Sequence, residues 1–144
     1  MTARTIRDIL ENQGFVTVHS EMPVSEVAAL MKSRGIGAIS VLDGSQLVGI
    51  FTERDALFRV AAEGLDPKDT TVATVMTPNP KTISADKPFT DALEVMHTGQ
   101  FRHVPVLDDG ELVGMVSSRD AMGPELEQFM YAKILEEQTR DVLA

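Results

Sequence analysis

Two short motifs in this chain combine a hydroxyl, a guanidinium and a carboxylate within four residues: TERD at Thr52–Asp55 and SSRD at Ser117–Asp120. Thr or Ser followed three residues later by Asp is typical of a helix capping box. A cation in the first turn of a helix is mildly unfavourable unless an anion lies nearby, so capping does not explain Arg54 and Arg119. Backbone N–H groups, a hydroxyl and a guanidinium at a helix start can bind a phosphate. An adjacent carboxylate can accept hydrogen bonds from two ribose hydroxyls, so two interpretations are open: a helix cap alone, or a nucleotide site.

The two motifs end two copies of a longer repeat. Residues 16–57 align with residues 81–122 without a gap, at an offset of 65 residues, and twelve aligned pairs are identical. Two copies are too few for a solenoid. We therefore expect two halves that pack against each other and position the motifs between them.

Each copy contains the same predicted elements. An alternating run, FVTVHS or KTIS, predicts a short strand. Pro23 or Pro88 then suits the first turn of a helix, and the apolar residues that follow have the i, i+3, i+4, i+7 spacing of one buried face. AISVLD and HVPVLD are each followed by an Asp/Gly turn and by LVGIF or LVGMV, a pattern that predicts a β-hairpin. A second helix begins at the motif.

The second helix of the first copy has its predicted apolar stripe at Ala56, Leu57, Val60 and Ala61, and Gly64 is placed to end it. Short helices are also predicted in the segments that precede the copies, ARTIRDIL and TTVATVM.

These elements suggest three parts of the chain. Residues 1–66 form the first copy with its lead-in segment, and residues 67–123 form the second copy with its own. Residues 124–144 are predicted to form an amphipathic helix with Leu126, Phe129, Met130 and Ile134 on one side. We expect this helix to pack against the two copies or against a partner subunit.

Composition excludes several classes of function. The net charge of −9 repels nucleic acid and anionic lipid at long range, so any bound anion needs a local cluster of cations. The sequence has no Cys, which rules out disulfides and thiolate chemistry. No apolar run approaches the ~20 residues that cross a bilayer. The first residues lack the hydrophobic region of a secretory signal, so we expect no membrane partner and a cytoplasmic location.

An ordered set of motifs, GIFTERDA, GMVSSRDA, MTPNPKTIS and FRHVPVLDDGELVG, resembles the tandem cystathionine β-synthase (CBS) domain pair, or Bateman module, over about residues 4–123. The resemblance implies an α+β fold (α/β by some schemes) of two βαββα units packed through their sheets with pseudo-twofold symmetry. It implies that clefts between the copies bind an adenosine-containing ligand such as AMP, ADP or ATP, with no other cofactor required. It also implies a disc-like homodimer. Family members act as sensors within larger proteins, but here we expect no second domain to be regulated in cis.

The resemblance assigns roles in two clefts, each formed by the motif of one copy and the strands of the other. It assigns the Asp of each motif to ribose, and the hydroxyl and the Arg to phosphate. The first cleft is expected to contain Thr52, Arg54 and Asp55 with Lys81, Thr82, Ile83, Phe101, Arg102, His103 and Val104. The second cleft is expected to contain Ser117, Arg119 and Asp120 with Val16, Thr17, Val18, Ile36, Gly37 and Ala38. The strand residues are expected to surround the adenine ring.

The two copies differ where FRHVP in the second replaces IGAIS in the first. Arg102 and His103 can extend toward phosphates, whereas Gly37 and Ala38 cannot. Because Arg102 and His103 belong to the same copy as Ser117, we expect the second cleft to hold more phosphate charge. For His103 another interpretation stays open, a rim residue whose ring packs on the hairpin.

We expect a regulatory module, not an enzyme. The three His, at positions 19, 97 and 103, have no close metal-ligand spacing, and the sequence has no Walker loop or nucleophile elbow. A ligand that touches both copies would favour the arrangement in which both contact it and so alter partner binding. The alternative is an interaction scaffold that dimerises through helices and binds no nucleotide.

Overall fold

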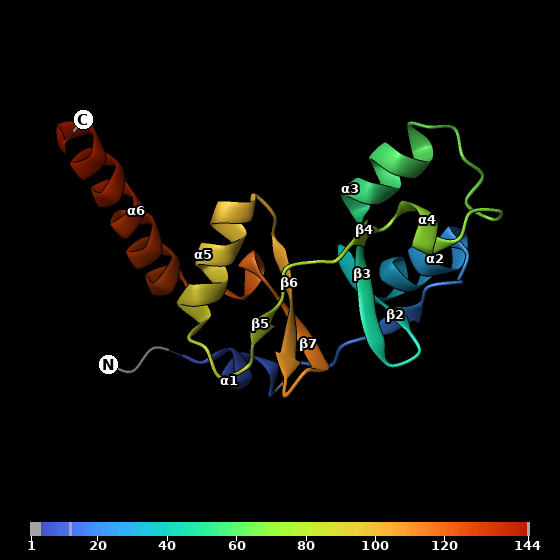
Figure 1. Ribbon diagram of the computed structural model, residues 1–144, viewed down its shortest axis with the longest axis horizontal. Helices are drawn as coiled ribbons and strands as arrows, with labels where there is room; N and C mark the ends of the chain where they lie inside the picture. Colours follow the sequence, from blue (N-terminus) through green and yellow to red (C-terminus); the bar gives the residue numbers. More distant parts are fainter. Residues whose placement is uncertain (1–3, 12, 144) are drawn as a thin grey trace.

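The computed structural model describes residues 4–11 and 13–143 and shows two α+β halves side by side (Figure 1). The first half contains β1 (Thr17–His19), α2 (Val24–Arg34), β2 (Ala38–Asp43), β3 (Gln46–Thr52), α3 (Glu53–Asp55) and the π-helix η1 (Ala56–Ala61). The second half contains β5 (Ile83–Ser84), α5 (Phe89–Gly99), β6 (His103–Asp108), β7 (Glu111–Ser117) and the 3₁₀ turn η2 (Ser118–Asp120). The remaining elements are α1 (Ile6–Leu10), α4 (Val72–Val75), β4 (Thr77–Pro78) and α6 (Gly123–Leu143). The predicted α+β fold of two related units is confirmed.

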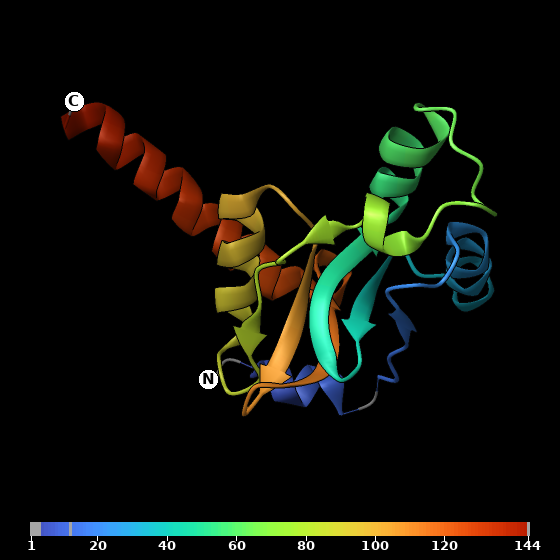
Figure 2. The same ribbon diagram turned by 45° about the vertical axis from the view of Figure 1, so that its right-hand side comes forward.

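The hairpins of the two halves share one register. Ala38 pairs with Thr52 in the first half, and His103 pairs with Ser117 in the second. Both hairpins shift register at the same place, after Val41 and after Val106. In each half the first strand runs parallel to the second, and in the first half β4 extends the sheet beside β3. The halves meet where β3 contacts β7, and Figure 2 shows the two sheets facing each other at this contact.

The helices α2 and α5 follow the predicted pattern with one difference at their starts. Pro23 and Pro88 are the extended N-cap residues rather than members of the first turn. Both helices end at a residue in the left-handed region, Gly35 with φ 63° and Gln100 with φ 58°. In each half, this left-handed C-cap residue turns the chain back toward the start of the hairpin. At that end of the hairpin, the motif of each half faces the opposite half.

The lead-in helices pack against the opposite halves. Ile6 and Ile9 of α1 lie in the hydrophobic core of the second half, together with Phe89. Val72 and Val75 of α4 lie in the core of the first half. Each half is therefore completed by a helix that lies outside its own repeat. The sequence boundaries at residues 66 and 123 remain a prediction, but they do not coincide with these two cores.

The predicted stripe on the second helix of the first half is wrong in part. Val60 is buried and Ala56 is half-buried, but Leu57 is 58% exposed and Ala61 is also exposed. After one turn of α-helix the backbone changes to i→i+5 hydrogen bonding, as in the bond from the Ala62 N–H to the Leu57 carbonyl at 2.9 Å. Because this bonding widens each turn, the spacing expected for an α-helix no longer marks one face.

In the part of the second half that the structure describes, no helix corresponds to η1. Its motif forms only the three-residue turn η2, and Ala121 then returns to an extended conformation with ψ 131° before α6 begins at Gly123. The argument that a helix N-terminus attracts a phosphate therefore does not hold for the second cleft, because a single 3₁₀ turn has no comparable dipole.

The C-terminal helix α6 extends away from both halves (Figure 1). It is held near its start by Phe129, which packs against the core of the second half, and by an ion pair from Lys133 to Glu94 at 2.5 Å. Leu126, Met130 and Ile134 are 39%, 55% and 49% exposed, so three of the four residues of the predicted apolar face are exposed. Among the helices that the structure describes, none is both long and apolar enough to cross a membrane.

Candidate functional site

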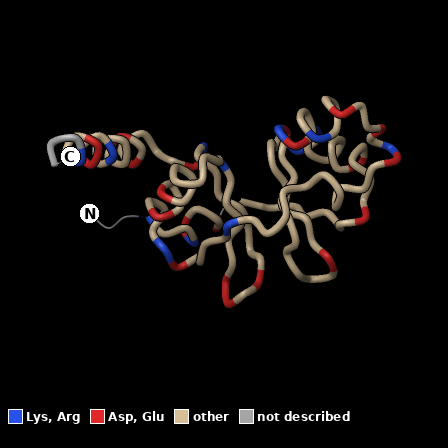
Figure 3. The backbone as a smooth tube through the Cα atoms, turned by 45° about the horizontal axis from the view of Figure 1, so that its top comes forward, with Lys and Arg blue, Asp and Glu red and all other residues tan. Residues whose placement is uncertain are grey.

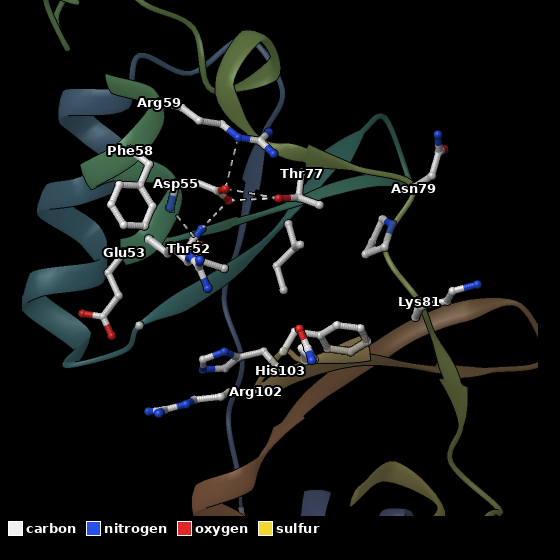
Figure 4. A pocket seen from close by; sticks show the side chains of 16 residues that line it. Thr52, Glu53, Asp55, Phe58, Arg59, Thr77, Asn79, Lys81, Arg102 and His103 are labelled. Carbon is white, nitrogen blue, oxygen red and sulfur yellow. Dashed lines mark hydrogen bonds and ion pairs between the residues drawn. The ribbon is translucent and has the colours of Figure 1, made fainter. Parts of the chain in front are cut away.

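Two cavities lie between the halves, and each one contains one motif. The first cleft has a volume of about 760 Å³ and contains the Thr52–Asp55 motif (Figure 4). The second cleft has a volume of about 430 Å³ and contains Ser117, Arg119 and Asp120. Both volumes are in the range of small-molecule sites.

In the first cleft, Asp55 is the most constrained residue of the motif. The residue is only 6% exposed, and its carboxylate accepts a hydrogen bond from the Thr52 N–H at 3.1 Å, while the Asp55 N–H donates to the Thr52 hydroxyl at 3.1 Å. This reciprocal pair is the predicted capping box. The Thr77 hydroxyl also donates to the carboxylate, at 3.2 Å, and Arg59 Nε lies 3.6 Å from Oδ1. Asp55 therefore has protein partners around most of its acceptor positions.

The structure gives Arg54 an explanation that the sequence analysis lacked. Its guanidinium lies over the ring of Phe58, 5.3 Å from the centroid. Both side chains are exposed and line the first cleft. A cation–π contact of this kind is worth ~0.5–1 kcal/mol at an exposed site. Arg54 is thus accounted for without a bound phosphate, and the sequence argument that gave it one is weakened.

Cations are concentrated in the first cleft. Its lining includes Arg54, Arg59, Lys81 and Arg102, which are four of the 13 Lys and Arg in the chain. Only two of the 22 acidic residues, Glu53 and Asp55, line it. Figure 3 shows acidic residues spread over both halves and over α6. In a chain with net charge −9, this local excess of positive charge gives the first cleft the character of an anion site.

Figure 4 shows how the two halves contribute to the first cleft. Asp55, Thr77 and Arg59 lie on one side, and Arg102 and His103 face them from the second half. Lys81 lies on the segment that connects the halves. A ligand in this cavity would therefore contact both halves and the connection between them.

The second cleft has a more accessible carboxylate. Asp120 is half-buried, and it accepts hydrogen bonds from the Gln13 side chain at 2.7 Å and from the Ser117 N–H at 2.8 Å. Arg34 and Arg119 supply its positive charge. The predicted capping box is thus present here as well, and the ion pair with Arg59 is a feature of Asp55 in the first cleft.

His103 lines both clefts. Its side chain is half-buried, and burial is the main cause that lowers its pKa below the ordinary value. The nearby cations Arg119 and Arg102 lower the pKa further, whereas Glu53 and Asp120 oppose that shift. The ring is therefore neutral at neutral pH unless an anion approaches it.

Most predicted site residues line the expected clefts, and the rest face elsewhere. Of the predicted strand residues, Lys81, Phe101, Arg102 and His103 line the first cleft, and Val16, Ile36, Gly37 and Ala38 line the second. Thr17, Val18, Thr82, Ile83 and Val104 line neither. Val18 and Val104 are buried in the cores, because successive strand residues point to opposite faces. The roles assigned to the residues in the clefts remain predictions.

The cations of the two clefts are distributed differently from the expectation. Arg102 lines the first cleft and not the second, and the first cleft also holds Lys81. The expectation counted the charge of Arg102 with the motif of its own copy, although the resemblance assigned Arg102 to the first cleft. In the structure, the residue before β6 faces the motif of the opposite copy.

The sequence analysis also missed several residues of the first cleft. Phe58 and Arg59 lie four residues beyond Arg54 and Asp55, at a spacing that brings side chains together on a helix. The four-residue spacing in the sequence could therefore have predicted these two contacts. Thr77, Asn79 and Pro80 belong to the segment between the copies, just before the aligned repeat; Gly14 and Phe15, 65 residues before Asn79 and Pro80, line the second cleft.

Comparison with known proteins places the chain among CBS domain proteins. The CBS domain family matches residues 5–62 and 72–123. The chain is 33% identical over 116 residues to the CBS domain-containing protein YhcV of Bacillus subtilis, covering 81% of each protein. It is 38% identical over 109 residues to CBSCBSPB3 of Arabidopsis thaliana, covering 75% of this chain. The match spans only 20% of that plant protein.

Solved structures show the same fold. A putative signal-transduction protein with CBS domains from Burkholderia ambifaria is similar with a TM-score of 0.77 and 32% identity, over 81% of this chain and 90% of that one. A CBS domain protein from Pyrobaculum aerophilum, complexed with AMP, has a TM-score of 0.79 and 25% identity over 89% and 99% of the two chains. The CBS domain pair of protein MJ0100, in complex with 5'-methylthioadenosine and S-adenosyl-L-methionine, has a TM-score of 0.74 and 27% identity over 92% and 99%. The repeated sequence, the paired halves and these matches lead to one conclusion: the chain belongs to the CBS domain family.

Proposed function

We propose that the chain is a regulatory module that binds an adenine nucleotide in the first cleft. The observation that carries the proposal is the gathering of Lys81, Arg102, Arg54 and Arg59 around a cavity of about 760 Å³ in an acidic protein. Two structural neighbours were solved with adenosine-containing ligands, AMP in one and 5'-methylthioadenosine with S-adenosyl-L-methionine in the other. CBS domain proteins are generally regulatory modules, which favours sensing over catalysis.

Residues of the first cleft match the parts of such a ligand. Ile50 and Phe101 offer apolar surface for the adenine ring. Lys81 and Arg102 offer charge for a phosphate from the connecting segment and from the second half. Asp55 is the predicted ribose acceptor, but its contacts with Thr77 and Arg59 leave it few free acceptor positions. A ribose at this carboxylate must therefore share it with Thr77 or replace Arg59.

The regulatory consequence follows from where the ligand would bind. A ligand that contacts both halves stabilises the arrangement in which both contacts are made. The connecting segment lines the same cavity through Thr77, Asn79, Pro80 and Lys81. Binding is therefore expected to order this segment relative to the two halves. Since adenine nucleotides are the ligand, a cytoplasmic site of action is part of the proposal.

Thermal unfolding in the presence of AMP, ADP, ATP, NAD⁺ or S-adenosylmethionine tests the proposal. A ligand at about 100 times its dissociation constant adds about 2.7 kcal/mol to the free energy of unfolding and raises the melting temperature. Adenosine and inorganic phosphate, each alone, are the controls that separate recognition of the whole nucleotide from recognition of its parts. A melting temperature that none of the five ligands raises, with protein freed of carried-over ligand, would contradict the proposal.

A second candidate, self-association, is favoured by exposed apolar side chains. Leu57 and Phe58 on η1 are 58% and 52% exposed, and Met130, Tyr131 and Ile134 are exposed on α6. We propose that these faces form a homodimer, which is compatible with nucleotide binding and is also the basis of the alternative scaffold function. Analytical ultracentrifugation over a range of concentrations tests this idea. A protein that stays monomeric at every concentration would exclude both the homodimer and the scaffold.

A further inference from the structure

One side chain is shared between the two clefts. Among the residues that the structure describes, only Gly37 and His103 line both cavities. They lie where β2 and β6 begin, and Gly37 has no side chain to separate the cavities. A group bound in either cleft is therefore close to the same imidazole.

Each cleft presents one carboxylate and one guanidinium to His103. The first cleft supplies Glu53 and Arg102, and the second supplies Asp120 and Arg119. These four residues are the charged groups that act on the ring from α3, from the residue before β6 and from η2. Charge brought into either cleft therefore changes the field at one shared titratable group.

Gly37 leaves room at the border between the clefts for the Glu53 side chain. The Glu53 N–H donates to the Gly37 carbonyl at 3.0 Å, and a Cβ at position 37 would lie 2.6 Å from Glu53 Oε1. The space that a larger residue would fill thus holds the Glu53 carboxylate, at the border between the clefts. An acid and an imidazole, rather than an apolar wall, separate the two cavities.

We propose that His103 couples the two clefts, so that a phosphate-bearing ligand in one cleft favours protonation of the ring and strengthens binding of a second such ligand in the other. This inference rests on the proposed function and adds its regulation. One imidazolium has two N–H donors, so a single protonated ring can stabilise anions on both sides. By linkage, each ligand must strengthen the other by the same factor.

The direction of the pH effect follows from the field at the ring. Burial keeps His103 neutral above its lowered pKa, and a phosphate beside Arg102 or Arg119 raises that pKa. Binding therefore takes up a proton at a pH between the pKa of the free protein and that of the complex. Affinity for AMP is expected to increase as the pH falls through this range and to decrease as it rises.

Calorimetric titration with AMP at about pH 6 and about pH 8, in buffers of different ionisation enthalpy, tests the inference. Wild-type protein is expected to take up a proton on binding, and the second AMP is expected to bind roughly fivefold more tightly than the first after statistical correction. His103→Gln is expected to lose both effects. His97→Gln is the matched control and should keep them, because His97 is exposed on α5 and lines neither cleft. Adenosine, which lacks the phosphate, is expected to bind without proton uptake.

Each outcome decides between the claims. AMP binding without proton uptake, or with the same uptake in His103→Gln, overturns the coupling and leaves nucleotide binding intact. No AMP binding at either pH overturns the proposed function itself. If His103→Gln does not fold, NMR titration of the wild-type His103 ring decides the matter, since a ring pKa that AMP does not raise contradicts the inference.

Discussion

The Thr77 hydroxyl donates to the buried Asp55 carboxylate at 3.2 Å, which ties the segment between the halves to the motif of the first half. Arg59 strengthens the tie from η1. Its Nε lies 3.6 Å from the same carboxylate, and its Nη1 donates to the Met76 carbonyl at 2.7 Å. Asp55 therefore contacts both the connecting segment and η1 in addition to capping α3. Any role in ligand binding is added to this structural one.

Replacing Thr77 by Val tests the structural role. The substitution preserves the shape of the side chain and removes one hydrogen bond to a buried carboxylate, which is expected to cost about 1–2 kcal/mol of unfolding free energy. Urea denaturation measures the loss. Thr98→Val is the matched control, because the Thr98 hydroxyl is exposed on α5 and reaches only Glu94 at 3.5 Å. Equal stability of the two variants would show that the tie between Thr77 and Asp55 contributes nothing.

The two motif carboxylates should differ in their contribution to stability. Asp55→Asn removes the charge opposite Arg59 at a buried position and is expected to cost about 2–3 kcal/mol. Asp120→Asn affects a half-buried group bonded to Gln13 and Ser117, and about 1 kcal/mol is expected. Denaturation of the two variants in parallel gives the comparison. A larger loss for Asp120→Asn would contradict the structural distinction between the clefts.

Protonation of His103 should destabilise the ligand-free protein. Burial lowers the folded-state pKa below the ordinary value of 6.5, so the folded state resists the charge that the unfolded chain accepts. The contribution to stability is fully present above that ordinary value and is lost as the pH falls through it toward the folded-state pKa. Denaturation curves between pH values of about 8 and about 5 measure the loss. His103→Gln should flatten this part of the profile, whereas an unchanged slope would mean that another group causes it.

The ion pair between Arg4 and Glu125 should have its own pH window. The hydrogen bond from Arg4 is the main cause that lowers the pKa of Glu125, with a smaller contribution from the Met122 N–H, and burial opposes both. The contribution of the ionised Glu125 carboxylate to the free energy of unfolding is present when the pH is above 4.5, the ordinary pKa of the group. This contribution is lost as the pH falls below that value. Glu125→Gln is expected to cost about 1 kcal/mol near neutral pH, because the pair is partly exposed. The cost should decrease as the pH falls below about 4.5, and a cost that does not change with pH would contradict this account.

The repeat predicts much of the fold because equivalent residues at an offset of 65 build equivalent structures. The hairpins share even their register shift, after Val41 and Val106. The packing of each lead-in helix against the opposite half was not predictable in the same way. Ile6 with Ile9 and Val72 with Val75 offer similar apolar pairs. Each pair packs in the core of the half that does not directly follow it in the sequence.

The candidate site was predictable to the extent that side chains follow local spacing. The capping box at Thr52 follows from three-residue spacing, and the stacking of Arg54 on Phe58 could have been expected from four-residue spacing. The π-helix could not, because Ala56–Ala61 carries no sequence signal for i→i+5 bonding. The position of Arg102 opposite the motif of the other copy depends on how the halves meet; the repeat alone does not specify it, and the expectation came from the family resemblance.

The most direct test of the central claim is calorimetric titration of ligand-free protein with AMP, using Arg102→Met and Arg140→Met as a matched pair. Both variants remove one exposed guanidinium, but Arg102 lines the first cleft and Arg140 lies on α6, away from it. Loss of a charge-assisted contact is expected to weaken AMP binding at least about tenfold in Arg102→Met and to leave Arg140→Met like wild type. No binding by wild-type protein, or equal affinity in the two variants, would contradict nucleotide binding in the first cleft.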